Sequence, residues 1–170
     1  MKMFKRFAAA LLVGVMALAM LTACGKEAIV RDTEQEKTAI ALTQSAAKTK
    51  LNVDLEEDET VTGIAATGLP AAVDMYNAAM KKDQKAYVAA VNDLATTVQA
   101  KIAAAGKKGI VIADVVPGKL NAEFMEIEFN LLQAQVQAGT LKVDFTPAKV
   151  GAAVTTKGDY TAFVIVVTNE

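Results

Sequence analysis

The feature that most limits how this chain can fold is a change in hydrophobic spacing at Gly109. Before it, apolar residues recur at every third or fourth position, which is typical of helices with one buried face. After it, β-branched residues stand in continuous or alternating runs, which is typical of strands. We therefore expect an α+β fold, with two to three N-terminal helices packed on a C-terminal antiparallel β-meander of four to five strands.

The first helix should begin at Asp32, because an acidic residue followed three positions later by Gln35 resembles a capping box. Lys48 and Lys50 lie where basic residues favour the end of a helix. The apolar stripe of this helix is thin and predicts light packing. It consists of Ile40, Ala41, Ala47 and Leu51.

Two further helices form a predicted antiparallel hairpin. Pro70 suits the first position of one helix, and Asp83 can cap the next, which should stop at Gly106. The apolar face of the first consists of Leu69, Val73, Tyr76 and Met80. The apolar face of the second consists of Tyr87, Val91, Leu94, Val98 and Ile102. At helical spacing, such faces are more often core than ligand-binding surfaces.

Between the first helix and this hairpin lies the strongest charge run of the chain, residues 54–59, with five carboxylates in six positions. The run lacks the spacing and the glycine of a calcium-binding EF-hand loop. We interpret it as a solvated loop and assign no metal site to it.

The second half begins with a run over 110–116 that predicts a strand buried on both faces and closed by Pro117 and Gly118. Residues 122–137 fit two structures. Strict alternation of apolar and polar residues favours a long strand with a bulge, which is the interpretation that we prefer. The alternative is a helix, whose apolar face would consist of Leu120, Phe124, Ile127, Leu131 and Ala134.

Three more strands complete the predicted sheet. Turns are expected at 138–140 and at 157–159, and the strands that they separate lie at 141–145, 150–155 and 160–168. Because short turns connect antiparallel neighbours, the C-terminal half should form a meander.

The N-terminus has the three parts of an export signal. A basic start with Lys2, Lys5 and Arg6 precedes an apolar run over residues 7–21, and small residues follow it. The run is shorter than the roughly 20 apolar residues that span a bilayer, so we interpret it as a cleaved signal rather than a transmembrane helix.

The end of this run, Leu21-Thr22-Ala23-Cys24, resembles the lipobox of bacterial lipoprotein precursors. The resemblance implies that the signal peptidase recognises Leu21, Thr22, Ala23 and Gly25 and cuts before Cys24. It also implies that Cys24 carries a diacylglycerol thioether and an N-acyl group, which would hold the protein at a membrane. Gly25 stands where an Asp would resemble an inner-membrane retention signal, so we expect the outer membrane in a Gram-negative cell. In a cell with one membrane, we expect the outer leaflet of that membrane.

These signals divide the chain into a signal peptide over 1–23, a short tether over 24–31 and a single α+β domain over 32–170. The signal would remove three of the 18 basic residues and none of the 19 acidic ones, leaving an acidic domain with Arg31 as its only arginine. Because affinity for phosphate needs clustered basic residues, we expect no nucleic-acid partner.

Most catalytic devices are excluded by composition. The chain has no His and a single Cys, so a Ser-His-Asp triad and the usual zinc sites cannot form. The only serine, Ser45, lies three residues before Lys48 on a predicted polar helix surface, and no phosphate-binding glycine loop occurs. Glu126 and Glu128 would lie about 7 Å apart on one face of a strand, a spacing also found in glycosidases. A solvated strand face explains them better.

Three functions remain as hypotheses. The first, which we favour, is a non-enzymatic interaction or structural module that presents a sheet edge or a helix face to another protein of the cell envelope. The second is a carrier of a small ligand or peptide, which needs a pocket between the helices and the sheet. The third is a hydrolase that works through carboxylates alone. We assign no catalytic residue, cofactor or metal.

Overall fold

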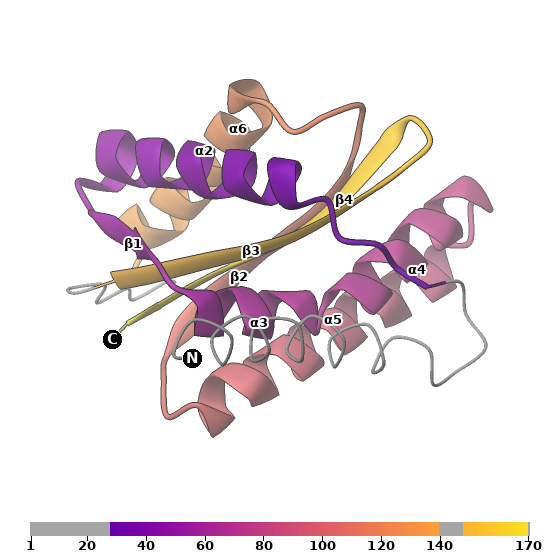
Figure 1. Cartoon of the computed structure of the whole chain (residues 1–170), viewed down its shortest axis with the longest axis horizontal. Coiled ribbons are helices and arrows are strands. Elements are labelled where there is room, and N and C mark those ends of the chain that lie inside the picture. The colour runs from indigo at the N-terminus through magenta and orange to yellow at the C-terminus, as the bar shows by residue number, and fades with distance from the viewer. Residues whose placement is uncertain (1–27, 140–147, 170) are drawn as a thin grey trace, which may run out of the picture. The chain divides into compact units, whose positions relative to one another are not determined.

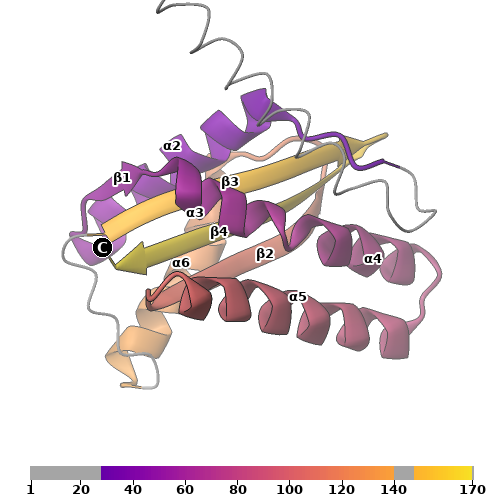
Figure 2. The same cartoon turned by 60° about the horizontal axis from the view of Figure 1, so that its bottom comes forward.

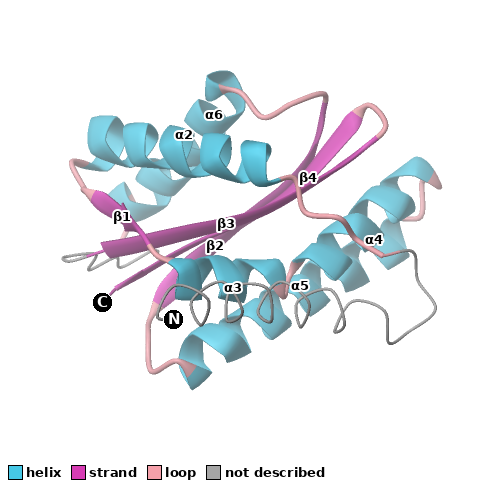
Figure 3. Cartoon of the chain, viewed as in Figure 1, coloured by secondary structure: helices cyan, strands magenta, loops and turns pink. Residues whose placement is uncertain are grey.

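The computed structural model describes residues 28–139 and 148–169 (Figure 1). The chain divides into two compact units, residues 1–30 and 31–170, and every element described below belongs to the second. Figure 3 shows how helices and strands are distributed along it. In chain order they are α2 (Thr33–Leu51), β1 (Leu55–Glu57), α3 (Glu59–Ala66), α4 (Leu69–Met80), α5 (Gln84–Ala104), β2 (Gly109–Pro117), α6 (Ala122–Gln137), β3 (Ala148–Lys157) and β4 (Tyr160–Asn169).

The described strands form one mixed sheet in the order β1-β3-β4-β2. β3 and β4 form an antiparallel hairpin, and β2 runs antiparallel to β4 along its other side. The hairpin turn contains Gly158, whose φ of 61° is a left-handed conformation that glycine adopts without strain. β1 is parallel to β3, so the expectation of a purely antiparallel meander is wrong, whereas the α+β class is confirmed.

Helices cover both faces of this sheet (Figures 1 and 2). α2 and α6 lie side by side on one face, with α2 over β3. α3, α4 and α5 lie on the other face, and α4 and α5 form the predicted hairpin. The described residues thus form five helices rather than two to three, and α6 comes from the half that was expected to be all strand.

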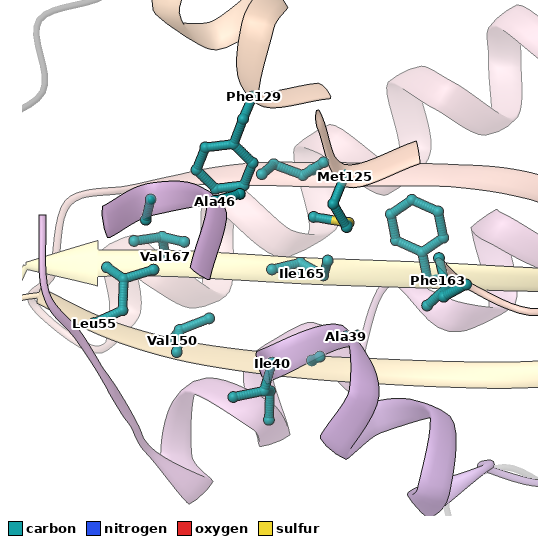
Figure 4. Packing of buried hydrophobic residues seen from close by; sticks show 14 of the residues in the cluster. Ala39, Ile40, Ala46, Leu55, Met125, Phe129, Val150, Phe163, Ile165 and Val167 are labelled. Atoms are coloured by element: carbon teal, nitrogen blue, oxygen red, sulfur yellow. The ribbon is translucent and has the colours of Figure 1, made fainter. Parts of the chain in front are cut away.

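Large side chains fill the sheet face under α2 and α6 (Figure 4). Phe163 and Ile165 of β4 share a buried cluster with Met125 and Phe129 of α6. Burying side chains of this size stabilises a fold by about 1.5–3 kcal/mol each. This cluster therefore fixes α6 on the sheet.

On the opposite face, two glycines allow close approach. Gly151 of β3 lies against the backbone of α3, because a Cβ at this position would overlap the amide nitrogen of Thr62. Gly68, before α4, is similarly close: a Cβ there would be 2.8 Å from a methyl carbon of Val98. On this face α3 contacts β3 through its backbone, while the buried side chains of Val98 and Val164 pack around Gly68.

Residues 122–137 form α6, so the favoured strand is wrong and the helical alternative is confirmed. Asn121 caps the helix, since its Oδ1 accepts a hydrogen bond of 3.2 Å from the N–H of Phe124. Met125 and Phe129, one turn apart, are its buried residues. The alternating pattern was misleading because Glu, Gln, Leu and Met are all good helix formers.

The buried face of α6 differs from the face that the helical alternative named. Ile127 and Leu131 are 51% and 56% exposed, and Ala134 is also exposed. Of that stripe, only Leu120, which precedes the helix, is buried, while Phe124 is half-buried. The actual face is rotated by about one residue, or roughly 100°.

The predicted ends of α2 and α5 are confirmed. Asp32 and Asp83 accept hydrogen bonds of 3.1 and 2.9 Å from N–H groups of the first turns, and Gly106, with φ of 71°, follows the end of α5. The capping box is incomplete, however. The Oε1 atom of Gln35 accepts from the N–H of Leu120 at 3.2 Å instead of returning to Asp32.

The predicted apolar stripes were less accurate than the helix ends. Leu94, Val98 and Ile102 of α5 are buried as expected. The buried residues of α4 are Leu69, Ala71, Ala72, Met75 and Ala78. Stripe members that the structure leaves exposed are Ala41, Met80 and Val91. Alanines carry little periodic signal, so a face built from them is hard to recognise in sequence.

Residues 54–59 are largely solvated as expected, but they do not form a loop. Their middle is strand β1, in which only Leu55 is buried. Asp58 then caps α3, accepting from the N–H of Val61 at 3.0 Å. The strand arises from backbone pairing with β3 rather than from a hydrophobic pattern, and neither β1 nor α3 was predicted.

The run over 110–116 forms β2, but β2 is an outer strand rather than one buried on both faces. Only Ile112 and Val116 are buried in it. The strands expected at 150–155 and 160–168 are confirmed as parts of β3 and β4. The strand expected at 141–145 lies outside the described residues.

Candidate functional site

The outer edge of β2 is the candidate functional site. β2 spans nine residues from Gly109 to Pro117 and ends the sheet on the side away from β1. Its sequence is rich in β-branched residues, and most of its side chains are half-buried. A long outer strand of this kind is a template for pairing with another strand.

The direction of each backbone group in β2 follows from its ends. The N–H of Asn169 donates to the carbonyl of Lys108 at 3.0 Å, and the N–H of Gly118 donates to the carbonyl of Asp159 at 2.6 Å. Each pair continues the β2–β4 register, in which residues face each other directly. Because hydrogen-bonded pairs alternate in antiparallel sheets, even-numbered residues of β2 bond to β4 and odd-numbered ones point away from the sheet.

At three positions of β2, a backbone group that points away from the sheet is already bonded or is missing. The N–H of Val115 donates to Oδ1 of the neighbouring Asp114 at 2.7 Å, and the Nε2 of Gln99 in α5 donates to the carbonyl of Gly109 at 3.5 Å. Pro117 has no N–H to leave unpaired. Within residues 28–139 and 148–169, the outward N–H and C=O groups of Val111 and Ala113 have no hydrogen-bond partner.

The opposite edge of the sheet is covered in part by β1 and by the start of α2. Beyond the short strand β1, the N–H of Asp32 donates to the carbonyl of Val154 at 2.8 Å. The N–H of Val154 donates in turn to Oε1 of Glu36 at 3.2 Å. Glu36 is buried, and its two carboxylate oxygens accept from Nε and Nη2 of Arg31 at 2.6 and 2.8 Å. The start of α2 thus replaces a neighbouring strand along β3.

Negative charge gathers at the open edge. Asp114 of β2 and Glu128 of α6 are both half-buried. Burial, and then the charge of Asp114, raises the pKa of Glu128 above its ordinary value. Burial and Asp114 likewise raise the pKa of Tyr87 in α5. The carboxylate of Asp114 lies at the edge of the strand, since its Oδ1 accepts from the outward N–H of Val115.

No cation neutralises this charge within the described part of the chain. The ion pairs found there join Arg31 to Glu36, Lys48 to Asp54 and Lys149 to Glu56. Asp114 and Glu128 belong to none of them. The open edge therefore combines free backbone groups with an uncompensated pair of carboxylates.

The glutamate pair named from the sequence does not form. In helix α6, residues two positions apart point in different directions, so Glu126 is exposed while Glu128 is half-buried. Asp114 was not singled out, although one signal pointed to it: it is the only charged residue in the β-branched run over 110–116. Ser45 is exposed on α2, and the nearby Lys48 is paired with Asp54 at 2.7 Å.

Apart from the β2 edge, a hollow lies between α4 and α5. It has a volume of about 430 Å³ and opens widely to solvent. Its polar lining includes Asp74, Lys81 and Asp93, and alanines form much of the rest. Among the residues with described positions, no group of three or more His, Cys, Asp or Glu could hold a metal ion.

The lipobox residues, Leu21, Thr22, Ala23, Cys24 and Gly25, lie outside the described residues. In the part of the chain that the structure covers, no helix is both long enough and apolar enough to cross a membrane. No family model, curated protein or solved structure matches this chain.

Proposed function

We propose that this chain is a lipid-anchored, non-enzymatic interaction module of the bacterial cell envelope. In this proposal, the open edge of β2 pairs with an extended segment of another envelope protein. The observation that carries it is the pair of unbonded outward residues, Val111 and Ala113, in a long outer strand. Addition of a strand would satisfy these groups through main-chain hydrogen bonds.

The anchor in this proposal is Cys24. Its support is the sequence Leu21-Thr22-Ala23-Cys24 behind a basic and apolar export signal. Two or three acyl chains supply stable attachment, since each buried methylene contributes about 0.8 kcal/mol. The expected location is the outer membrane of a two-membraned cell, or the outer leaflet of a single membrane.

The non-enzymatic part rests on chemistry that the composition excludes. Without His, the chain has no residue whose ordinary pKa lies near neutral pH, which most acid–base and nucleophilic catalysis uses. The Glu126 and Glu128 arrangement on which a carboxylate hydrolase would depend is absent from α6.

The edge proposal is tested by crosslinking in intact cells. A photo-crosslinking amino acid at Val111 should capture one abundant envelope protein, whereas the same residue at the exposed Ala41 of α2 should not. Equal capture from both positions, or capture from neither, would contradict the proposal.

A proline variant identifies the edge itself. Ala113→Pro removes an outward N–H without touching the bonds to β4, and Pro117 already occupies an equivalent odd-numbered position. Crosslinking from Val111 should fall at least tenfold in this variant. Ala113→Ser keeps the N–H and should leave crosslinking unchanged.

The anchor is tested separately. Cys24→Ser should abolish labelling by radioactive palmitate and release the protein from membranes. A Cys24→Ser protein that is still processed and membrane-bound would overturn the lipoprotein part of the proposal while leaving the edge part intact.

A carrier of small polar ligands is the second candidate, because the hollow between α4 and α5 has the volume of a ligand site. Ala89 lines it and is exposed, so Ala89→Leu should fill space there without disturbing the core. A small molecule that raises the melting temperature of the wild-type protein but not of Ala89→Leu would favour this function.

A further inference from the structure

The chemistry of the partner strand can be read from what surrounds the open edge of β2. Even-numbered side chains of β2 point to the face covered by α2 and α6, because Ile112 and Val116 belong to the buried cluster there. Asp114 is also even-numbered, so its side chain leaves the strand on that face. Glu128 belongs to α6, whose Met125 and Phe129 share that cluster, and the charge of Asp114 contributes to the raised pKa of Glu128.

An incoming strand would bring its own side chains to this place. In antiparallel pairing, the residue directly opposite Asp114 points to the same face, with its Cβ about 4.5–5.5 Å from the Cβ of Asp114. A long basic side chain there can reach both Asp114 and Glu128. An acidic one would place a third negative charge beside two that are already half-buried.

The same charges act against a second copy of this chain as the occupant. Pairing of two β2 strands about a two-fold axis would bring Asp114 and Glu128 of both copies to one seam. No basic residue lies in β2, so neither copy would supply a cation from its edge strand. Four carboxylates along one desolvated seam repel each other, and an inward-pointing charge on an outer strand is a common protection against such self-association.

We propose that the open edge of β2 selects an extended segment of a different protein that carries Lys or Arg opposite Asp114. This inference rests on the proposed function, since it names the partner chemistry of the same edge. The backbone groups of Val111 and Ala113 bond to the partner strand, and the carboxylates of Asp114 and Glu128 favour a basic side chain in it.

A displayed library of random nine-residue peptides tests the inference, with the lipidated protein in detergent as the target. Peptides selected by the wild-type protein should carry Lys or Arg at one fixed position. Asp114→Asn keeps an oxygen that can accept from Val115 but removes the charge, so the selected peptides should bind it about tenfold more weakly. Glu128→Gln should weaken binding in the same direction, and Glu126→Gln, an exposed control on the same helix, should not.

The outcomes separate this inference from the proposed function. Peptides that lose binding with Ala113→Pro but show no basic preference would overturn the charge inference and leave the edge function standing. A library that yields no peptide sensitive to Ala113→Pro would overturn both. A dimer in sedimentation that dissociates with Ala113→Pro would make a second copy the occupant and would also overturn the charge inference.

Discussion

The two edges of this sheet differ in whether their outward backbone groups are hydrogen-bonded. Along β3, Asp32 and Glu36 bond both outward groups of Val154, and a partly buried ion pair between Arg31 and Glu36 fixes the arrangement. Along β2, the outward groups of Val111 and Ala113 have no partner among the described residues. Helices flank both edges, so the difference comes from particular side chains rather than from the layered architecture. An unprotected edge favours unwanted pairing, and its presence here, opposite an edge that α2 and β1 cover in part, is the reason to propose a use for it.

The largest loss of stability should come from disturbing the packing of α3 against β3. Gly151→Ala would force a methyl group into the backbone of α3, so the free energy of unfolding should fall by at least about 3 kcal/mol. Gly63 of α3 has open space around it, and Gly63→Ala should instead stabilise by about 0.5–1 kcal/mol. Urea unfolding measures both, and similar values for the two variants would contradict the close approach of α3.

Breaking the ion pair at the β3 edge should have the next largest effect. Glu36→Ala leaves Arg31 without its carboxylate and the N–H of Val154 without an acceptor, which should cost about 3 kcal/mol. Glu34→Ala, at an exposed site of the same first turn, should cost less than about 1 kcal/mol. A loss at Glu36 no greater than that at Glu34 would mean that this edge does not depend on the pair.

Hydrogen exchange should sharpen the comparison without any mutation. The amides of Ile112 and Asp114, which point to β4, should exchange at least about tenfold more slowly than those of Val111 and Ala113. The amide of Val154 in β3 should be protected. Uniform protection along β2 would show that its outward groups are bonded after all.

The smallest effect concerns the charge at the open edge. Because the pKa of Glu128 is raised in the folded state, its ionisation costs stability once the pH exceeds the pKa of the unfolded chain, and the cost is complete above the folded pKa. Glu128→Gln should therefore stabilise the protein at pH 7, by about 0.5 kcal/mol or less because Glu128 is only half-buried. At pH 3 the variant should gain nothing. A gain that is independent of pH would rule out this electrostatic origin.

What could be predicted from sequence was mostly local. Caps at Asp32 and Asp83, the stop at Gly106 and the hairpin turn at Gly158 depend on a few adjacent residues, and all of them are confirmed. β1 was missed because its three residues become a strand only by pairing with β3, more than ninety positions later. α6 was mistaken for a strand because its alternating pattern fits both periods, while its buried residues depend on tertiary packing.

The candidate site was even less accessible to sequence reasoning. Which strand lies at the edge of a sheet is a property of strand order, and the β-branched run of β2 looks the same in an inner strand. Its one charge, Asp114, was the available clue. Glu128 was noticed only as part of a pair that the helix separates.

The junction at Asp32 has a mechanical consequence. The chain enters the folded unit at Arg31, and within the next few residues it is tied to β3 by the Asp32–Val154 backbone bond and by the hydroxyl of Thr156, which donates to Asp32 Oδ2 at 2.8 Å. If Cys24 is anchored, a pull between the membrane and a partner strand on β2 would pass from this junction through β3 and β4. The load would then run across the hydrogen-bonded width of the sheet, while α4 and α5 would bear almost none of it.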